Sequence, residues 1–120
     1  MLLRIGIIFF LCYLIACSSS KKIANTGIIK ADKTDSLAGL EFVKRSDCVT
    51  CHKIGEKFVG PAFTDIAKKY ELNTDNLNKL SKKIITGGKS TWGKVPMIPH
   101  SLLSEEDAKA MVKYILLLKN

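Results

Sequence analysis

The sequence predicts an all-α domain of about four helices, and two observations lead to this fold class. Apolar residues recur with the 3.6-residue period of a helix in several segments after residue 35, and no stretch alternates polar and apolar residues as a half-buried strand does. The chain also contains no internal repeat. At 120 residues it has room for a single domain.

Residues 1–16 are predicted to form a signal peptide. Arg4 is followed by an apolar run that ends at Ala16 and is too short to span a bilayer as a mature helix. Residues 14–17 (LIAC) resemble the lipobox of bacterial lipoproteins, which implies that Cys17 is acylated and becomes the first mature residue. The expected location is therefore the extracytoplasmic face of a bacterial membrane. An uncleaved anchor and an ordinary secretory cleavage are the alternatives.

Residues 17–35 are expected to form the lipidated N-terminus and a flexible tether, and residues 36–120 the folded domain. The segment that follows Cys17 is polar and mostly lacks helical periodicity. About 18 flexible residues have a root-mean-square reach of roughly 20 to 25 Å. That reach would let a small domain turn toward a partner in the membrane.

Two helices are expected in the first half of the domain. One runs through residues 37–45, with Asp35 or Ser36 as its N-cap. The other covers residues 61–70 and has Pro61 in its first turn, where a proline is tolerated. Its buried face is expected to consist of apolar residues at helical spacing, namely Phe63, Ile66, Ala67 and Tyr70.

Two more helices are expected in the second half. One covers residues 74–86, with Thr74 as its N-cap and the glycine pair at 87 and 88 as its stop. The other follows Ser104, begins with three acidic residues that suit the positive end of a helix dipole, and runs to Lys119. The apolar core of such a domain is small, and a large apolar prosthetic group at its centre would add the buried apolar surface that the core lacks.

The segment CVTCH at residues 48–52 has three possible chemical roles. Once Cys12 leaves with the signal peptide and Cys17 is acylated, Cys48 and Cys51 are the remaining thiols. A disulfide across a two-residue loop would contribute little stability. The segment could therefore be a redox dithiol, half of a zinc site or a haem attachment point.

Haem attachment fits the pattern best. A redox dithiol of the thioredoxin type needs a βαβ context, which an all-α pattern lacks. A zinc site would need His100 as the fourth ligand beside the CVTCH residues, and His100 stands alone in the sequence. Two thiols one helical turn apart can add to the two vinyl groups of a porphyrin, while the adjacent His52 reaches the iron.

A sixth iron ligand is expected far downstream, in the segment TWGKVPMIPH. Met97 lies between Pro96 and Pro99, which restrict the backbone and would present the thioether rigidly. Met111 instead occupies an apolar helix face and is expected to be core packing. Met97 is therefore the candidate, and His100 is either a surface histidine or an alternative iron ligand.

Three segments together resemble the small class I cytochromes c of the bacterial cytochrome c-551/c-552 type. They are residues 48–70 (CVTCHKIGEKFVGPAFTDIAKKY), residues 84–100 (IITGGKSTWGKVPMIPH) and residues 108–119 (AKAMVKYILLLK). The resemblance runs from about Gly39 to the C-terminus. It implies the cytochrome c fold, with about four helices wrapped around one covalently bound haem c.

The resemblance also implies roles for individual residues. Cys48 and Cys51 would bind the haem covalently, with His52 as the proximal and Met97 as the distal iron ligand. The family's usual Pro-Met-Pro-Pro reads PMIPH here, so ligation by His100 at some pH stays open.

Three more residues would belong to the haem pocket. Gly60 and Pro61 match the family's Gly-Pro pair, in which the proline carbonyl accepts the Nδ1 proton of the proximal histidine. Trp92 matches a tryptophan near a haem propionate, and it could equally be a large core aromatic.

The resemblance implies a one-electron carrier between membrane respiratory complexes rather than an enzyme. The alternatives are a haem subunit or docking module of a larger oxidase or reductase and, less favoured, a peroxidase or a ligand-sensing haem protein. The net charge of +8 suits an acidic redox partner. Export disfavours a nucleic-acid partner. No small-molecule substrate is expected, and the protein is expected to be a monomer. Six lysines are expected near the haem crevice, namely Lys53, Lys57, Lys82, Lys83, Lys89 and Lys94.

Overall fold

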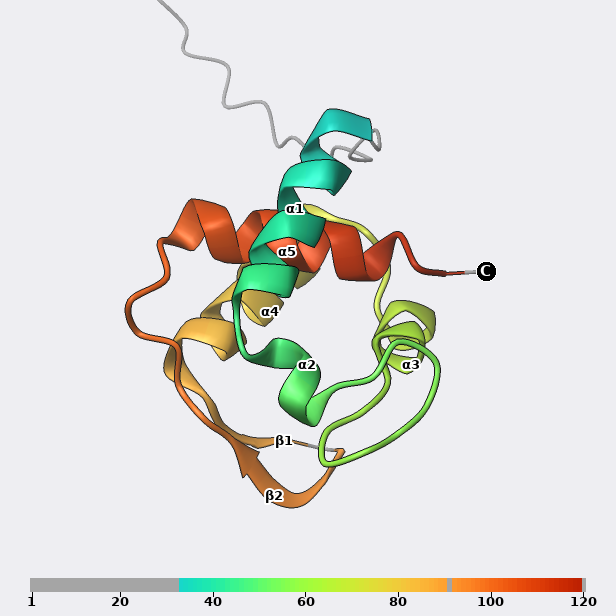
Figure 1. The fold of residues 1–120 in the computed structure, drawn as a ribbon, viewed down its shortest axis with the longest axis vertical. Helices are drawn as coiled ribbons and strands as arrows, with labels where there is room; N and C mark the ends of the chain where they lie inside the picture. The colour runs from blue at the N-terminus through green and yellow to red at the C-terminus, as the bar shows by residue number, and fades with distance from the viewer. Residues whose placement is uncertain (1–32, 91, 120) are drawn as a thin grey trace, which may run out of the picture.

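The computed structural model of the protein describes residues 33–90 and 92–119, which form five helices and one two-stranded hairpin (Figure 1). Helices therefore dominate the described part, as predicted. In chain order the elements are α1 (Lys33–Arg45), α2 (Cys48–Cys51), α3 (Phe63–Lys69), α4 (Thr74–Thr86), β1 (Gly88–Ser90), β2 (Gly93–Met97) and α5 (Glu105–Leu116).

The predicted signal peptide, the lipidation site Cys17 and the tether up to residue 32 lie outside the described residues. Helix α1 begins at Lys33, inside the segment expected to be the tether. Across the described ranges, no helix is both long enough and apolar enough to cross a membrane.

Helix α5 is the element against which α1, α3 and α4 pack. It crosses α1 near the middle of the molecule (Figure 1). The buried faces of these helices meet in one apolar cluster: Val43, Phe63, Ile84, Ala108, Met111, Val112, Ile115 and Leu116. Burial of these side chains is the main force that holds the short helices together, because isolated helices of this length are marginal in water.

The helix ends largely follow local sequence chemistry. Ser104 Oγ accepts a hydrogen bond from the Asp107 N–H at 3.0 Å and caps α5, which begins directly after Ser104 as predicted. Helix α4 is capped by Asn73, whose Oδ1 accepts from the Asn76 N–H at 2.9 Å, and not by the predicted Thr74. Either side chain can cap a helix, so sequence alone leaves a one-residue ambiguity. Helix α5 ends at Leu116, earlier than predicted.

A short β-hairpin occupies the segment between α4 and α5 that was expected to be a loop. Strands β1 and β2 are antiparallel, with Gly88 opposite Met97 and Ser90 opposite Gly93, and the register shifts between these pairs. The side chains at positions 94–96 of β2 are all exposed, so the hairpin lacks the alternation that predicts a strand from sequence.

Gly87 fixes how this hairpin leaves α4. Its φ of 62° is unfavourable for any residue with a side chain, and a Cβ there would lie 2.5 Å from the Met97 carbonyl oxygen. Lys83 supports the same turn, because its Nζ donates to the carbonyl oxygens of Gly88 at 2.8 Å and Lys89 at 2.5 Å. The position of Met97 thus depends on the glycine stop of the preceding helix.

Candidate functional site

A cavity of about 440 Å³ lies inside the domain, and it is lined by residues of α2, α3, α4, the hairpin and α5. A volume of this size suits a large organic ligand. The cavity collects every sequence-predicted site residue of the described ranges: Cys48, Cys51, His52, Gly60, Pro61, Trp92, Pro96 and Met97. Cys48 and Met97, which are 49 positions apart in the sequence, therefore line the same cavity.

His52 directly follows α2, and its ring is held in one orientation. Its Nδ1 lies 2.8 Å from the Pro61 carbonyl oxygen, which can only accept, so Nδ1 carries the proton and donates. The Nε2 lone pair is then available to a metal. This hydrogen bond selects the tautomer that iron ligation needs and increases the donor strength of the ring.

Two neighbours pack against the His52 ring and hold it in place. Phe63 stacks on the ring with a centroid distance of 5.4 Å and an interplanar angle of 10°. A Cβ at Gly60 would lie 2.5 Å from His52 Cε1, so a side chain at that position would collide with the ring. Gly60 is thus required by the close approach of the loop to His52.

Cys48 and Cys51 stand at the two ends of the single-turn helix α2, and both are half-buried. Burial raises the pKa of the Cys48 thiol, and the neighbouring Asp47 carboxylate raises it further. Redox-active cysteines of the thioredoxin type work with a lowered pKa and follow a strand. The environment of Cys48 thus disfavours the dithiol interpretation, while the one-turn spacing suits attachment to one edge of a porphyrin.

Met97 ends strand β2 and packs against the apolar core. It is partly buried and lines the same cavity as His52, although the two residues come from opposite halves of the domain. Met111 also lines the cavity but sits in the middle of α5 and is fully buried, in keeping with a packing role. The hairpin therefore brings a thioether to the same cavity that the His52 imidazole lines.

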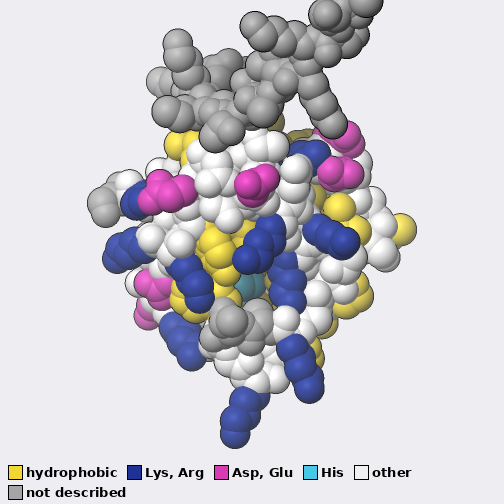
Figure 2. All heavy atoms as spheres, turned by 180° about the vertical axis from the view of Figure 1, so that it is seen from behind, with side chains coloured by type: hydrophobic (Ala, Val, Ile, Leu, Met, Phe, Trp, Pro, Cys, Tyr) yellow, Lys and Arg dark blue, Asp and Glu magenta, His cyan; other side chains and the backbone are white. Residues whose placement is uncertain are grey.

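The opening of the cavity is surrounded by basic side chains. Figure 2 shows dark-blue Lys and Arg side chains around a hollow in which apolar side chains and a histidine are visible. Three lysines line the cavity itself: Lys79, Lys83 and Lys89. Lys83 and Lys89 were among the six lysines predicted for the crevice, and Lys79 was missed. The other four do not line the cavity.

Aromatic side chains accompany these lysines. The Lys69 Nζ lies 4.6 Å from the centroid of the Trp92 ring, and the Lys79 Nζ lies 5.5 Å from that of Tyr70. Both aromatic rings line the cavity. A cationic and aromatic wall of this kind suits the acidic propionate groups of a porphyrin.

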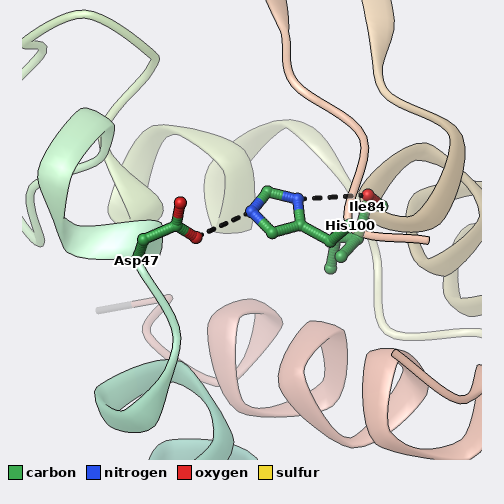
Figure 3. A network of polar contacts seen from close by, with 3 residues as sticks. All are labelled: Asp47, Ile84 and His100. Carbon is green, nitrogen blue, oxygen red and sulfur yellow. Dashed lines mark hydrogen bonds and ion pairs between the residues drawn. The ribbon is translucent and has the colours of Figure 1, made fainter. Parts of the chain in front are cut away.

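His100 is not the exposed surface histidine that the sequence suggested as one possibility. Its side chain is only 15% exposed, and its Nε2 lies 2.8 Å from Asp47 Oδ1. Its Nδ1 lies 3.3 Å from the Ile84 carbonyl oxygen (Figure 3). Both ring nitrogens thus face oxygen atoms of the protein. The zinc interpretation, which needs His100 beside Cys48 and Cys51, has no support in this geometry.

Comparisons with known proteins give the same answer as the residues that line the cavity. The sequence profile of the cytochrome c family matches residues 36–119. The chain belongs to the cytochrome c family. It is 42% identical over 81 residues to cytochrome c-551 of Pseudomonas denitrificans, which covers 68% of this chain and 98% of that protein. It is also 40% identical over 88 residues to cytochrome c-552 of Hydrogenobacter thermophilus, with coverages of 69% and 89%.

The crystal structure of Nitrosomonas europaea cytochrome c552 has the same fold. It superposes with a TM-score of 0.62 at 41% identity and covers 67% of this chain and 99% of the compared chain. The predicted cytochrome c fold is thereby confirmed. The five helices of the described ranges include the four that were expected, and the additional one is the single turn α2.

Membership of this family establishes the cofactor and the general activity. The protein binds one covalent haem c and carries electrons, so it is an electron-transfer protein and not an enzyme. Class I cytochromes c typically act in the periplasm and exchange electrons with redox partners. The cavity fits this cofactor, because it combines an apolar wall with a thiol pair and an oriented imidazole.

Proposed function

We propose that this cytochrome holds its haem through Cys48 and Cys51 and ligates the iron with His52 and Met97. The observation that carries the proposal is the His52 Nδ1 contact with the Pro61 carbonyl oxygen at 2.8 Å, since it leaves Nε2 as the only ring atom that can ligate iron. Support also comes from the shared cavity, which all four side chains line.

Three neighbours of the ligands complete the proposed haem pocket. Gly60 gives the His52 ring its space, and Pro96 restricts the backbone just before Met97. Trp92 stands beside the cavity with a lysine ammonium over its ring, which favours a role near a propionate. These residues orient the ligands and the edge of the porphyrin rather than bind iron.

The proposed ligand set suits electron transfer and would leave no position for a substrate at the metal. When bound, haem c supplies a one-electron iron couple. His52 and Met97 together would occupy both axial positions, so no position remains for a substrate. The stacked and hydrogen-bonded His52 ring has little freedom to move, which keeps the rearrangement that accompanies electron transfer small.

Partners are proposed to dock at the basic opening of the cavity through an acidic surface. The net charge of +8 and the lysines at the cavity favour such a partner at low ionic strength. Exposed apolar side chains that line the cavity, on the loop after His52 and on either side of Met97, would add contact area there: Val59, Val95 and Ile98. The protein would act as a monomer.

We further propose that acylation of Cys17 anchors the protein at the extracytoplasmic face of a bacterial membrane. There it would shuttle electrons between respiratory complexes within reach of its tether. The support is the sequence pattern at residues 14–17. A Cys17→Ser variant is expected to appear in the soluble fraction, and its retention in the membrane would contradict the anchor.

An optical spectrum of the purified holoprotein tests the ligand proposal. We expect reduced bands of the c type, haem that stays on the protein in acidified acetone, and a weak far-red sulfur-to-iron band in the ferric state. Met97→Ala should abolish that band. Met111→Leu, a volume-conserving change in the same cavity wall, should keep it. A far-red band that survives in Met97→Ala would refute Met97 as the ligand.

The docking proposal can be tested with small charged oxidants. Replacing Lys79 or Lys89 with Glu should slow oxidation by anionic hexacyanoferrate and speed oxidation by a cationic cobalt complex, each by several-fold at low salt. Lys44→Glu is the matched control, because Lys44 lies on α1 and does not line the cavity. Equal effects of the Lys44 and Lys79 variants would contradict docking at the cavity.

A further inference from the structure

His100 ties the chain that follows Met97 to two other parts of the domain. Its backbone N–H donates to the Ile84 carbonyl oxygen at 3.1 Å, and its ring Nδ1 lies 3.3 Å from the same oxygen. Its ring Nε2 lies 2.8 Å from Asp47 Oδ1 (Figure 3). With Nε2 protonated the ring donates to the carboxylate, which is the shorter and stronger ring contact. His100 thus links the Met97 loop (residues 97–100), α4 and the start of α2.

Asp47 is the unexpected partner in this link. It is the N-cap residue of α2, yet its side chain makes no capping hydrogen bond to that helix. Its carboxylate contacts His100, which is 53 positions away in the sequence. Cys48 directly follows Asp47, so the His100 contact connects the haem attachment helix with the Met97 loop.

The loop between Met97 and His100 has few other polar attachments to the core. The Ile98 side chain is 57% exposed, and Pro99 is exposed and has no N–H to donate. On the upstream side, Met97 is held by its pairing with Gly88. On the downstream side, the chain returns to the helical core through His100.

We propose that the His100–Asp47 contact is a clamp that holds Met97 in its ligating position. His100 is thus a positioning residue and not an iron ligand, and the proposal rests on the His52 and Met97 ligation given above. An outward movement of the loop that carries Met97 would take its side chain away from the iron, and such a movement would pull on the His100 contacts. Loss of the clamp should therefore increase the fraction of molecules in which Met97 has left the iron.

Exogenous imidazole measures this fraction in the ferric holoprotein. Imidazole binds only where Met97 has left, so its apparent affinity follows the population of the open loop. His100→Ala should bind imidazole about three- to tenfold more tightly, the size expected for one partly exposed charge-assisted hydrogen bond. Asp47→Ala should give the same change, and the double variant should add nothing further, because both residues act in one contact.

Two variants separate positioning from general stability. His100→Gln keeps an N–H donor of similar reach and should restore most of the wild-type imidazole affinity. Lys119→Ala breaks the contact between Lys119 Nζ and Glu71 Oε1, which is 2.7 Å long and also joins distant segments, but away from the cavity. It should leave imidazole affinity unchanged even if it lowers the unfolding temperature.

The outcomes distinguish this clamp from the ligand proposal. If the wild type shows the far-red band but His100→Ala binds imidazole as weakly as wild type, the clamp is wrong and Met97 ligation stands. If Lys119→Ala shifts the affinity as much as His100→Ala, the effect is general destabilisation and the clamp is again wrong. If the wild type lacks the far-red band, both proposals fail.

Discussion

The two proposed iron ligands are held by different kinds of interaction. His52 lies in a loop that is folded onto itself: the Gly60 N–H donates to the Cys51 carbonyl at 2.8 Å, and the Phe63 N–H donates to the Lys53 carbonyl at 2.9 Å. The residues that close this loop, at positions 61–63, are buried. Met97 ends a hairpin whose other described strand residues are exposed; its own side chain packs against the core, but the hairpin is attached by backbone pairing, a glycine turn and the His100 clamp.

The two sides of the site should therefore fail in different ways. Core packing holds the His52 side, so loss of apolar volume should affect it most. Backbone geometry and polar contacts hold the Met97 side, so substitutions that remove little volume can still loosen it. Paired measurements, unfolding free energy for the whole domain and the far-red band for Met97, separate the two.

The largest effect is expected from Phe63→Ala. Phe63 is 3% exposed and stacks on His52, so truncation should lower the free energy of unfolding of the holoprotein by about 3 to 5 kcal/mol. Phe58→Ala is the control, because Phe58 is 59% exposed and should change stability by no more than about 0.5 kcal/mol. Chemical denaturation followed by circular dichroism measures both. Similar losses in the two variants would overturn the view that packing holds the His52 side.

Gly87→Ala should have the next largest effect, and it should act on Met97. Positive φ strain and the approach of the new Cβ to the Met97 carbonyl together should cost about 2 to 4 kcal/mol. We expect the far-red band to disappear at lower denaturant than the helical signal does. Gly88→Ala is the control, because Gly88 also has a positive φ but its Cβ would meet only Lys83 Nζ, at 3.6 Å. If both variants lost the far-red band equally, backbone strain alone would explain the loss, and the approach of the Cβ to the Met97 carbonyl would play no part.

Gly60→Ala should perturb the His52 side by about 1 to 3 kcal/mol, because the new Cβ must displace the His52 ring. The expected result is less covalently attached haem per polypeptide and a shifted absorption maximum. In Gly55→Ala the Cβ meets no atom within 4 Å, so haem content should match the wild type. Wild-type haem content and spectrum in Gly60→Ala would show that the loop adjusts freely, against the rigidity inferred here.

The smallest effect is expected at the exposed first turn of α5, which follows the Met97 loop in the sequence. The ammonium of Lys109 lowers the pKa of Glu105 in the first turn of α5. Because the pKa of Glu105 is lower in the folded protein, its interaction with Lys109 stabilises the fold at any pH above the ordinary carboxyl pKa. This stabilisation is lost as the pH falls through the lowered pKa. The effect is small because Glu105 is fully exposed. In Lys109→Ala the pKa of Glu105 should return upward in an NMR titration, and an unchanged titration would contradict this origin.

Local chemistry made most of the fold predictable. The helix start after Ser104 and the glycine stop at positions 87 and 88 each depend on a few neighbouring residues, and the structure shows both as predicted. The apolar face of the helix that begins at Phe63 was also predictable, because helical spacing alone places Ala67 beside Phe63 on the buried side.

The features that sequence did not reveal depend on distant contacts or on exposed backbone. The hairpin has no buried alternation, so periodicity could not find it. The Asp47–His100 contact joins residues that share no local pattern, and the sequence therefore left His100 as either a surface residue or an iron ligand. Lys79 lines the cavity because of how α4 packs, which its position in the sequence does not show.

The packing of α5 has a consequence for the order in which this site can form. Residues of α5, among them Met111, Val112 and Ile115, supply part of the cavity wall, and α5 lies C-terminal to every other described element. Its contacts with α1 close a loop that spans most of the domain, and such a closure costs more chain entropy than a contact between neighbouring elements. A chain that has emerged only as far as the hairpin already contains Cys48, Cys51 and His52, but these residues are not yet enclosed by α5.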